Sequence, residues 1–176
     1  MSDAPHHLKF KAPSTWITRF APLTPKGGPS GGMVLDLAAG GGRHARHFLD
    51  RGHPVTVVDK DVSALADLAR DDRAEVMAID LEDGKPWPLP PRAFAAIVVS
   101  NYLFRAHFEG LIASLEPGGV LLYETFARGN ESFGRPRNPE HLLTSGELLD
   151  LVRGRLQVVA YEHGETDEAP PGVKQR

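Results

Sequence analysis

The sequence predicts an α/β fold of three layers, in which helices cover both faces of a doubly wound, mostly parallel sheet. Two observations predict it. Apolar, often β-branched runs alternate with helical patterns from about residue 33 to residue 163, as a parallel sheet with crossover helices requires. The first apolar run also leads directly into Gly40-Gly41-Gly42 and then into a helical pattern. A tight glycine turn that opens a helix is typical of a nucleotide site.

The predicted elements follow one another along the chain. A short amphipathic helix with Trp16, Ile17 and Phe20 on one face begins after a Ser14 or Thr15 cap. Strands are expected around Asp36 and over 55–58, 74–79, 94–100, 120–126 and 156–162, and helices over 44–51, 62–70, about 105–115 and 145–152, the last capped by Ser145. The connections are glycine- and proline-rich stretches at 22–32 and 81–92, a long loop at 127–141 and a turn-like stretch at 164–171.

The length of 176 residues suits one domain with a full core and is short for two. We therefore expect a single domain over residues 1–176. It would comprise an N-terminal helix and connector (1–32), a cofactor-binding core (33–163) and a partial C-terminal edge (164–176), where a last strand would only be starting.

The composition restricts the classes of function that the protein can have. With 41% hydrophobic and 24% charged residues the chain is typical of globular proteins, and a net charge of −3 provides no overall field that attracts nucleic acid. The absence of cysteine excludes disulfides, cysteine metal sites and thiol nucleophiles. No signal peptide and no apolar run long enough to cross a bilayer is present. We expect a cytoplasmic protein, a monomer or a homodimer, that binds neither membrane nor nucleic acid.

Acidic residues accompany the first three predicted strands, with Asp36 inside the first, Asp59 ending the second and Asp80 following the third. In a doubly wound sheet, ligands bind at the carboxyl ends of the strands. Taken alone, the glycine turn leaves two nucleotides open, because Gly40-x-Gly42-x-x-Ala45 also fits the dinucleotide fingerprint and Asp59 lies at about the right spacing for a nicotinamide ribose.

The stretch Val34-Leu35-Asp36-Leu37-Ala38-Ala39-Gly40-Gly41-Gly42 resembles the glycine motif of class I S-adenosylmethionine-dependent methyltransferases, and Glu116-Pro117-Gly118-Gly119-Val120-Leu121-Leu122 resembles their helix-to-strand turn. The similarity covers about residues 33 to 163, with Ala38 where the family usually has glycine. Asp36, Asp80, the second turn and the lack of another domain for a hydride acceptor favour the methyl donor over the nicotinamide alternative.

The resemblance implies S-adenosylmethionine as the cofactor and a role for each residue at the motif positions. Asp36 would hold the methionine amino group, Asp59 the ribose hydroxyls, and Asp80 with Leu81 the adenine. Arg43 would reach the cofactor carboxylate or remain in water. The residues expected to bind the cofactor are Asp36, Ala38, Gly40, Gly42, Arg43, Asp59, Lys60, Asp80, Leu81, Ser100 and Asn101.

In-line methyl transfer from a sulfonium needs alignment and exclusion of water more than a dedicated base. The catalytic residues are therefore left open, with three candidates. Tyr102 or Tyr123 could face the sulfonium through its ring, and Glu124 could accept a proton from the nucleophile. The alternative is that Tyr123 belongs to the core and that Glu124 is an ordinary strand-end acid.

Four arginines, Arg105, Arg128, Arg135 and Arg137, could clamp an anionic substrate, with solvated loop charge as the alternative. Residues 101–103, 123–126, 129–131 and 146–148 look like a bacterial subgroup similar to the tellurite-resistance methyltransferases, which implies a small-molecule substrate. No metal is expected, because His44, His47 and His53 lack a carboxylate partner in ligand spacing. A noncatalytic S-adenosylmethionine sensor and a nucleic-acid methyltransferase are further alternatives. The acidic balance argues against the latter.

Overall fold

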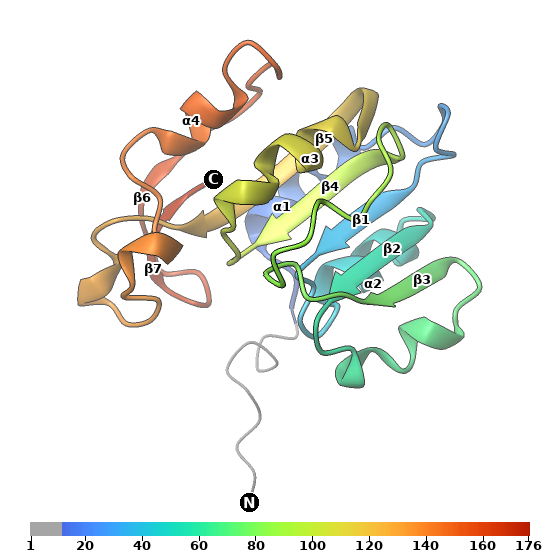
Figure 1. Ribbon diagram of the computed structural model, residues 1–176, viewed down its shortest axis with the longest axis horizontal. Helices are drawn as coiled ribbons and strands as arrows, with labels where there is room; N and C mark the ends of the chain where they lie inside the picture. Colours follow the sequence, from blue (N-terminus) through green and yellow to red (C-terminus); the bar gives the residue numbers. More distant parts are fainter. Residues whose placement is uncertain (1–11) are drawn as a thin grey trace, which may run out of the picture.

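The protein is built on a seven-stranded sheet with the strand order β3-β2-β1-β4-β5-β7-β6. The computed structural model describes residues 12–176, so the polar stretch at 1–11 lies outside the described residues. Strands β1 to β5 run parallel, whereas β7 pairs antiparallel with both β5 and β6. Helices lie on both faces (Figure 1). The predicted fold class, a doubly wound and mostly parallel sheet, is confirmed.

The bounds of the elements match the predictions best in the first half of the chain. The strands are β1 (Val34–Leu37), β2 (Val55–Asp59), β3 (Ala74–Ala78), β4 (Phe94–Ser100), β5 (Leu115–Phe126), β6 (His163–Thr166) and β7 (Gly172–Gln175). The α-helices are α1 (Thr15–Phe20), α2 (Arg43–Asp50), α3 (Phe108–Ala113) and α4 (Glu147–Val152). Short 3₁₀ turns are η2 (Ala21–Leu23), η3 (Ser63–Leu65), η4 (Leu68–Arg70), η5 (Arg105–His107), η6 (Asn130–Ser132) and η7 (Pro139–His141).

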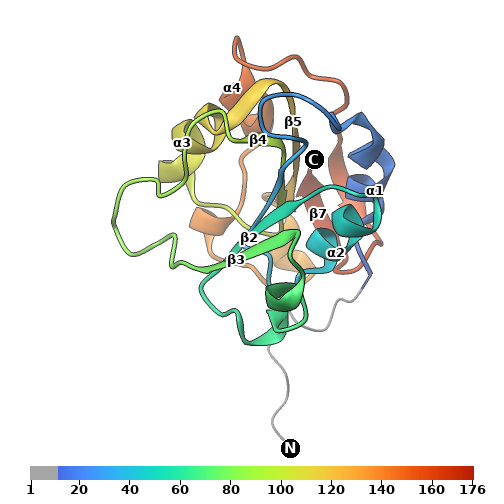
Figure 2. The same cartoon turned by 90° about the vertical axis from the view of Figure 1, so that its right-hand side faces the viewer.

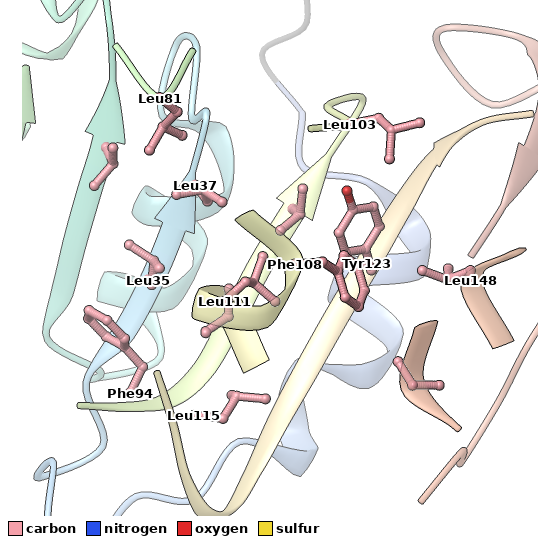
Figure 3. Close-up of a cluster of buried hydrophobic side chains, with 14 of the residues drawn as sticks. Leu35, Leu37, Leu81, Phe94, Leu103, Phe108, Leu111, Leu115, Tyr123 and Leu148 are labelled. Carbon is pink, nitrogen blue, oxygen red and sulfur yellow. The ribbon is translucent and has the colours of Figure 1, made fainter. Parts of the chain in front are cut away.

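Alternation along the parallel strands divides the core between the two faces of the sheet. Leu35 and Ile97 belong to the cluster on one face. Figure 3 shows Leu35 there with Phe108 and Leu111 of α3. Val34 and Val98 point to the other, where α1 and α2 cover them (Figure 2). Because β1 and β4 are buried on both faces, their sequences show continuous apolar runs, and these runs made them predictable.

The helix predicted over 62–70 is wrong. The structure has only the two 3₁₀ turns η3 and η4 there. Leu65 and Leu68 are both buried against α2, and a spacing of three residues serves a 3₁₀ turn as well as an α-helix. The apolar pattern contained the two buried leucines, but Ala66 and Ala69 of the same pattern are exposed, and the pattern did not determine the type of helix.

Two other helices start later than predicted. The helix expected at about 105–115 begins with η5, and its α-helical part is α3. Helix α4 follows Gly146, which has a φ of 75°, so Ser145 is not its cap. Ser14 does stand at the cap position of α1, but its side chain makes no capping hydrogen bond. Strand β5 already pairs with β4 at Leu115, ahead of the predicted glycine turn.

The strand predicted over 156–162 is also wrong. Its apolar residues include Val158 and Val159, which are 48% and 70% exposed. The position beside β5 is occupied instead by β7, and β6 overlaps the stretch at 164–171 that was expected to be turn-like and lies at the outer edge beyond β7. The segment at 172–175, expected only to start a strand, therefore lies inside the sheet, and strand pairing of this kind depends on distant residues that a local pattern does not contain.

Candidate functional site

A cavity of about 890 Å³ opens where the carboxyl ends of β1 to β4 meet the segments that follow β5. Ligands are expected at this edge of a doubly wound sheet. Of the predicted residues, the cavity is lined by Asp36, Ala38, Gly40, Arg43, Asp59, Lys60, Asp80, Leu81, Ser100, Asn101, Tyr102, Arg135 and Arg137. The other lining residues are Ala39, His44, Asp61, Ile79, Glu82, Phe126, Pro136, Asn138, His141 and Pro170.

The turn between β1 and α2 forms the floor of the cavity. Ala38 and Gly40 line it, and both have a left-handed backbone, with φ values of 52° and 55°. Alanine in this conformation costs about 1 kcal/mol relative to glycine, which explains why glycine suits position 38. Gly42 does not line the cavity; a Cβ there would lie 2.8 Å from Leu65 and 2.7 Å from Leu68, so this glycine lets α2 pack on η3 and η4.

Asp36 is the most buried carboxylate of the cavity, with 1% of its surface exposed. Its Oδ2 accepts a hydrogen bond of 2.8 Å from the backbone N–H of Ala45 in α2. Burial raises the pKa of Asp36 to about 7, although this hydrogen bond and the nearby Arg43 oppose the shift. A cationic ligand that binds beside Asp36, at the floor of the cavity, would stabilise its ionised form.

His44 lies between Asp36 and the start of α1. Its Nε2 accepts a hydrogen bond of 3.2 Å from the backbone N–H of Ser14, and burial lowers the pKa of the imidazole to about 3. The ring is therefore neutral, and its proton lies on Nδ1, 4.0 Å from Asp36 Oδ1. The sequence did not single out His44 as a cavity residue; its position one helical residue after Arg43 was the only available signal.

Asp59 and Asp80 are held in place by backbone N–H groups. Asp59 accepts from Gly40 N–H at 2.7 Å through one oxygen and from Asp61 N–H at 3.0 Å through the other. Asp80 accepts from Glu82 N–H at 2.9 Å. A carboxylate offers about four lone-pair sites, so both residues keep acceptor capacity for a ligand.

A chain of polar side chains runs from the cavity into the core beneath β4 and β5. Arg43 donates to Ser100 Oγ at 3.0 Å, and Ser100 in turn donates to Glu124 Oε1 at 2.8 Å. Arg43 also donates to the carbonyl oxygen of Ala12 at 3.1 Å. Burial lowers the pKa of Arg43, and the negative charge of Glu124 opposes that shift. Arg43 is thus fixed at the cavity wall at the start of α2.

The three catalytic candidates occupy different places. Tyr102 lines the cavity, and burial raises the pKa of its phenol. Tyr123 lies in the core, where its hydroxyl donates to the Tyr102 carbonyl at 2.9 Å. Glu124 is buried behind Ser100 and does not line the cavity. Only Tyr102 is therefore placed to touch a ligand in this cavity.

The four predicted substrate arginines also separate. Arg135 and Arg137 line the cavity, whereas Arg128 is exposed outside it. Arg105 pairs with Glu147 at 2.5 Å, and its guanidinium also donates to backbone carbonyls at 2.7 and 3.0 Å. Arg105 therefore holds the end of the long loop in place and does not reach a ligand. Within residues 12–176, no group of three or more histidine, cysteine, aspartate or glutamate side chains could hold a metal ion.

Neither a protein-family model nor a curated protein sequence matches the chain. Solved structures do match. An S-adenosylmethionine-dependent methyltransferase from Mesorhizobium loti is 19% identical, with a TM-score of 0.65 over 90% of this chain and 96% of that one. The fold is that of class I S-adenosylmethionine-dependent methyltransferases.

The glycopeptide N-methyltransferase MtfA, crystallised with S-adenosylhomocysteine, is 28% identical, with a TM-score of 0.57 over 94% of this chain and 89% of that one. The [4+2]-cyclase SpnF is 20% identical, with a TM-score of 0.57 over 74% of this chain. The chain spans only 53% of the length of SpnF. Since one of these proteins is described as a cyclase, the fold alone does not fix the reaction. No helix within residues 12–176 is long and apolar enough to cross a membrane.

Proposed function

We propose that this protein is an S-adenosylmethionine-dependent methyltransferase that acts on a small molecule. One observation carries the proposal: carboxylates at the carboxyl ends of three adjacent parallel strands, Asp36, Asp59 and Asp80, line one cavity beside the glycine turn. The fold of methyltransferases supports it. A tellurite-resistance type of activity remains a finer hypothesis that rests on sequence resemblance alone.

The residues present fit the proposed cofactor. Asp36 offers a buried carboxylate to the methionine ammonium, and Asp59 keeps lone pairs for two ribose hydroxyls. Asp80 and Leu81 lie where the adenine would be expected, and Arg43 offers guanidinium hydrogens to the methionine carboxylate. Lys60, Ser100 and Asn101 complete the proposed contacts. Gly42 is not among them, because it packs against η3 and η4.

Bound S-adenosylmethionine would supply an activated methyl group on a sulfonium. The chain itself would then bind and orient the acceptor and exclude water from the reacting atoms. Phe126, Pro136 and Pro170 give the cavity an apolar border on the side away from the acids. Tyr102, which follows the end of β4, presents an aromatic side chain to the cavity, and its ring could face the sulfonium.

Calorimetric titration tests the cofactor assignment. We expect S-adenosylmethionine and S-adenosylhomocysteine to bind with one site per chain, and reduced nicotinamide dinucleotide not to bind. Binding of the nicotinamide alone would contradict the proposal and favour the dinucleotide alternative that the glycine turn also fits.

A screen of small nucleophiles for production of S-adenosylhomocysteine tests the catalytic part. We expect at least one small-molecule acceptor to give turnover. Tight binding of the cofactor combined with no turnover on any acceptor would instead indicate a noncatalytic sensor.

A further inference from the structure

We propose that the methyl acceptor carries an oxyanion, a carboxylate or a phosphate, that Arg135 and Arg137 bind. The inference rests on the proposed function, since it assigns the acceptor to the part of the same cavity that the cofactor would leave open. The cavity of about 890 Å³ lies near the upper end of the range of about 300 to 1,000 Å³ for ligand sites. It therefore has room for a second, small molecule.

The cavity has two walls of opposite charge. On the side of β1 to β3, the five acids Asp36, Asp59, Asp61, Asp80 and Glu82 outnumber the two cationic residues Arg43 and Lys60, so this side, the acid wall, carries a net negative charge. On the side that follows β5, Arg135 and Arg137 project from the loop over residues 127–141, and His141 of the same loop also lines the cavity. An anionic molecule is repelled by the first wall and attracted by the second. A cationic acceptor would meet the opposite arrangement.

The two cavity arginines have no carboxylate partner among the described residues. Within residues 12–176, Arg137 donates only to the Gly134 carbonyl oxygen, at 3.3 Å, and Arg135 forms no ion pair with an acid. In contrast, Arg46, Arg105 and Arg176 each pair with a carboxylate elsewhere in the protein. The forked donors of Arg135 and Arg137 are therefore available for a ligand, and guanidinium groups bind carboxylates and phosphates through two parallel hydrogen bonds.

The backbone that carries these arginines is held on both sides. Asn130, with 1% of its surface exposed, donates from Nδ2 to the Pro136 carbonyl oxygen at 3.0 Å. At the other end, Arg105 donates to the carbonyl oxygens of Glu140 at 2.7 Å and of Leu142 at 3.0 Å. Fixing the backbone before binding lowers the entropy cost of holding a ligand. The backbone of the loop is thus preorganised for ligand binding.

Anion binding can be measured without knowing the acceptor. We would titrate inorganic phosphate, malonate and uncharged malonamide into the full chain, with and without saturating S-adenosylhomocysteine, and follow the amide signals of residues 134–141 by NMR. We expect phosphate, malonate or both to bind, malonamide not to bind, and Arg135→Ala with Arg137→Ala to weaken anion binding about tenfold or more. Selective binding of one anion identifies the acceptor's group as a phosphate or a carboxylate.

Arg128→Ala is the matched control, because Arg128 is an exposed arginine of the same loop outside the cavity. We expect it to leave anion binding unchanged. Absence of anion binding, or an equal loss in the control, would overturn the inference. Affinity for S-adenosylhomocysteine should be kept in the double variant. If this compound fails to bind the unmodified chain, the proposed function fails, and the titration without it still decides whether the arginines bind anions.

Discussion

The two walls of the cavity differ in which groups their hydrogen bonds hold in place. In the acid wall, backbone N–H groups hold the carboxylates themselves: Ala45 bonds Asp36, and Gly40 bonds Asp59. In the loop over residues 127–141, here called the arginine loop, side chains hold the backbone, as Asn130 does at Pro136, while Arg135 and Arg137 stay exposed. The acid wall presents fixed acceptors to an invariant cofactor. The loop presents longer, adaptable side chains, which suits a part of the site that determines which acceptor is used.

The largest expected effect concerns the most buried group of the acid wall. Asp36→Asn keeps an oxygen for the Ala45 N–H but removes the charge, so we expect affinity for S-adenosylhomocysteine to fall by more than tenfold. The same substitution should raise the free energy of unfolding at pH 8 by about 2 to 4 kcal/mol, because ionising a carboxyl with a pKa of about 7 opposes folding there. Calorimetry and urea denaturation measure the two quantities.

The sign of the pH dependence follows from the raised pKa. Asp36 is protonated in the folded protein below about pH 7 and ionised in the unfolded chain above about pH 4. Between these values the folded state holds the extra proton, so stability falls as the pH rises. The advantage of Asp36→Asn should therefore shrink when the pH is lowered from 8 to 5. If Asp36→Asn is less stable than the parent at pH 8, favourable interactions of the Asp36 carboxylate offset the cost of burying its charge.

Asp59→Ala should weaken binding of S-adenosylhomocysteine by about 1 to 3 kcal/mol, from the loss of charge-assisted hydrogen bonds to the ribose. Removing the carboxylate also frees the Gly40 N–H that it accepts from, so the glycine turn loses one of its anchors. Calorimetry measures the affinity. Asp72→Ala, which removes an exposed acid outside the cavity, is the comparison variant and should keep the affinity of the parent. Unchanged affinity for Asp59→Ala would show that Asp59 does not bind the ribose.

Asn130→Ala should act on the other wall alone. Loss of the hydrogen bond to Pro136 costs about 1 kcal/mol of stability and loosens the backbone that carries Arg135 and Arg137. We expect weaker phosphate or malonate binding with unchanged affinity for S-adenosylhomocysteine. Ser132→Ala, an exposed neighbour, should change neither affinity. Equal weakening of both ligands in Asn130→Ala would mean that the two walls are not independent.

The smallest effect is expected at the floor of the cavity. Ala38→Gly removes a Cβ from a residue with a φ of 52°, which should stabilise the protein by about 0.5 to 1 kcal/mol in thermal unfolding. Ala39→Gly is the matched control, since Ala39 is buried and lacks a positive φ. That variant should be destabilised. If both substitutions destabilise, the strain at Ala38 is already relieved by its contacts.

Prediction from the sequence succeeded where the residues of one short segment determine the structure of that segment. A buried parallel strand is apolar on both faces, so β1, β2 and β4 were predictable, and the acids that follow such strands lie together because parallel strands end at one edge. Arg105 could not be placed in this way, because its partner Glu147 is 42 residues away. The position of β7 inside the sheet was missed for the same reason, since it depends on pairing with β5.

The position of β7 also bears on how such a protein can diverge. The Ala127 N–H donates to the Val173 carbonyl oxygen at 2.9 Å, and a side chain at Gly172 would collide with Asn130. The β6–β7 hairpin therefore supports the arginine loop from behind and has no residue in the acid wall. Selection could remodel the hairpin and the loop together and change the acceptor, while the cofactor site, over residues 36–101, stayed unchanged.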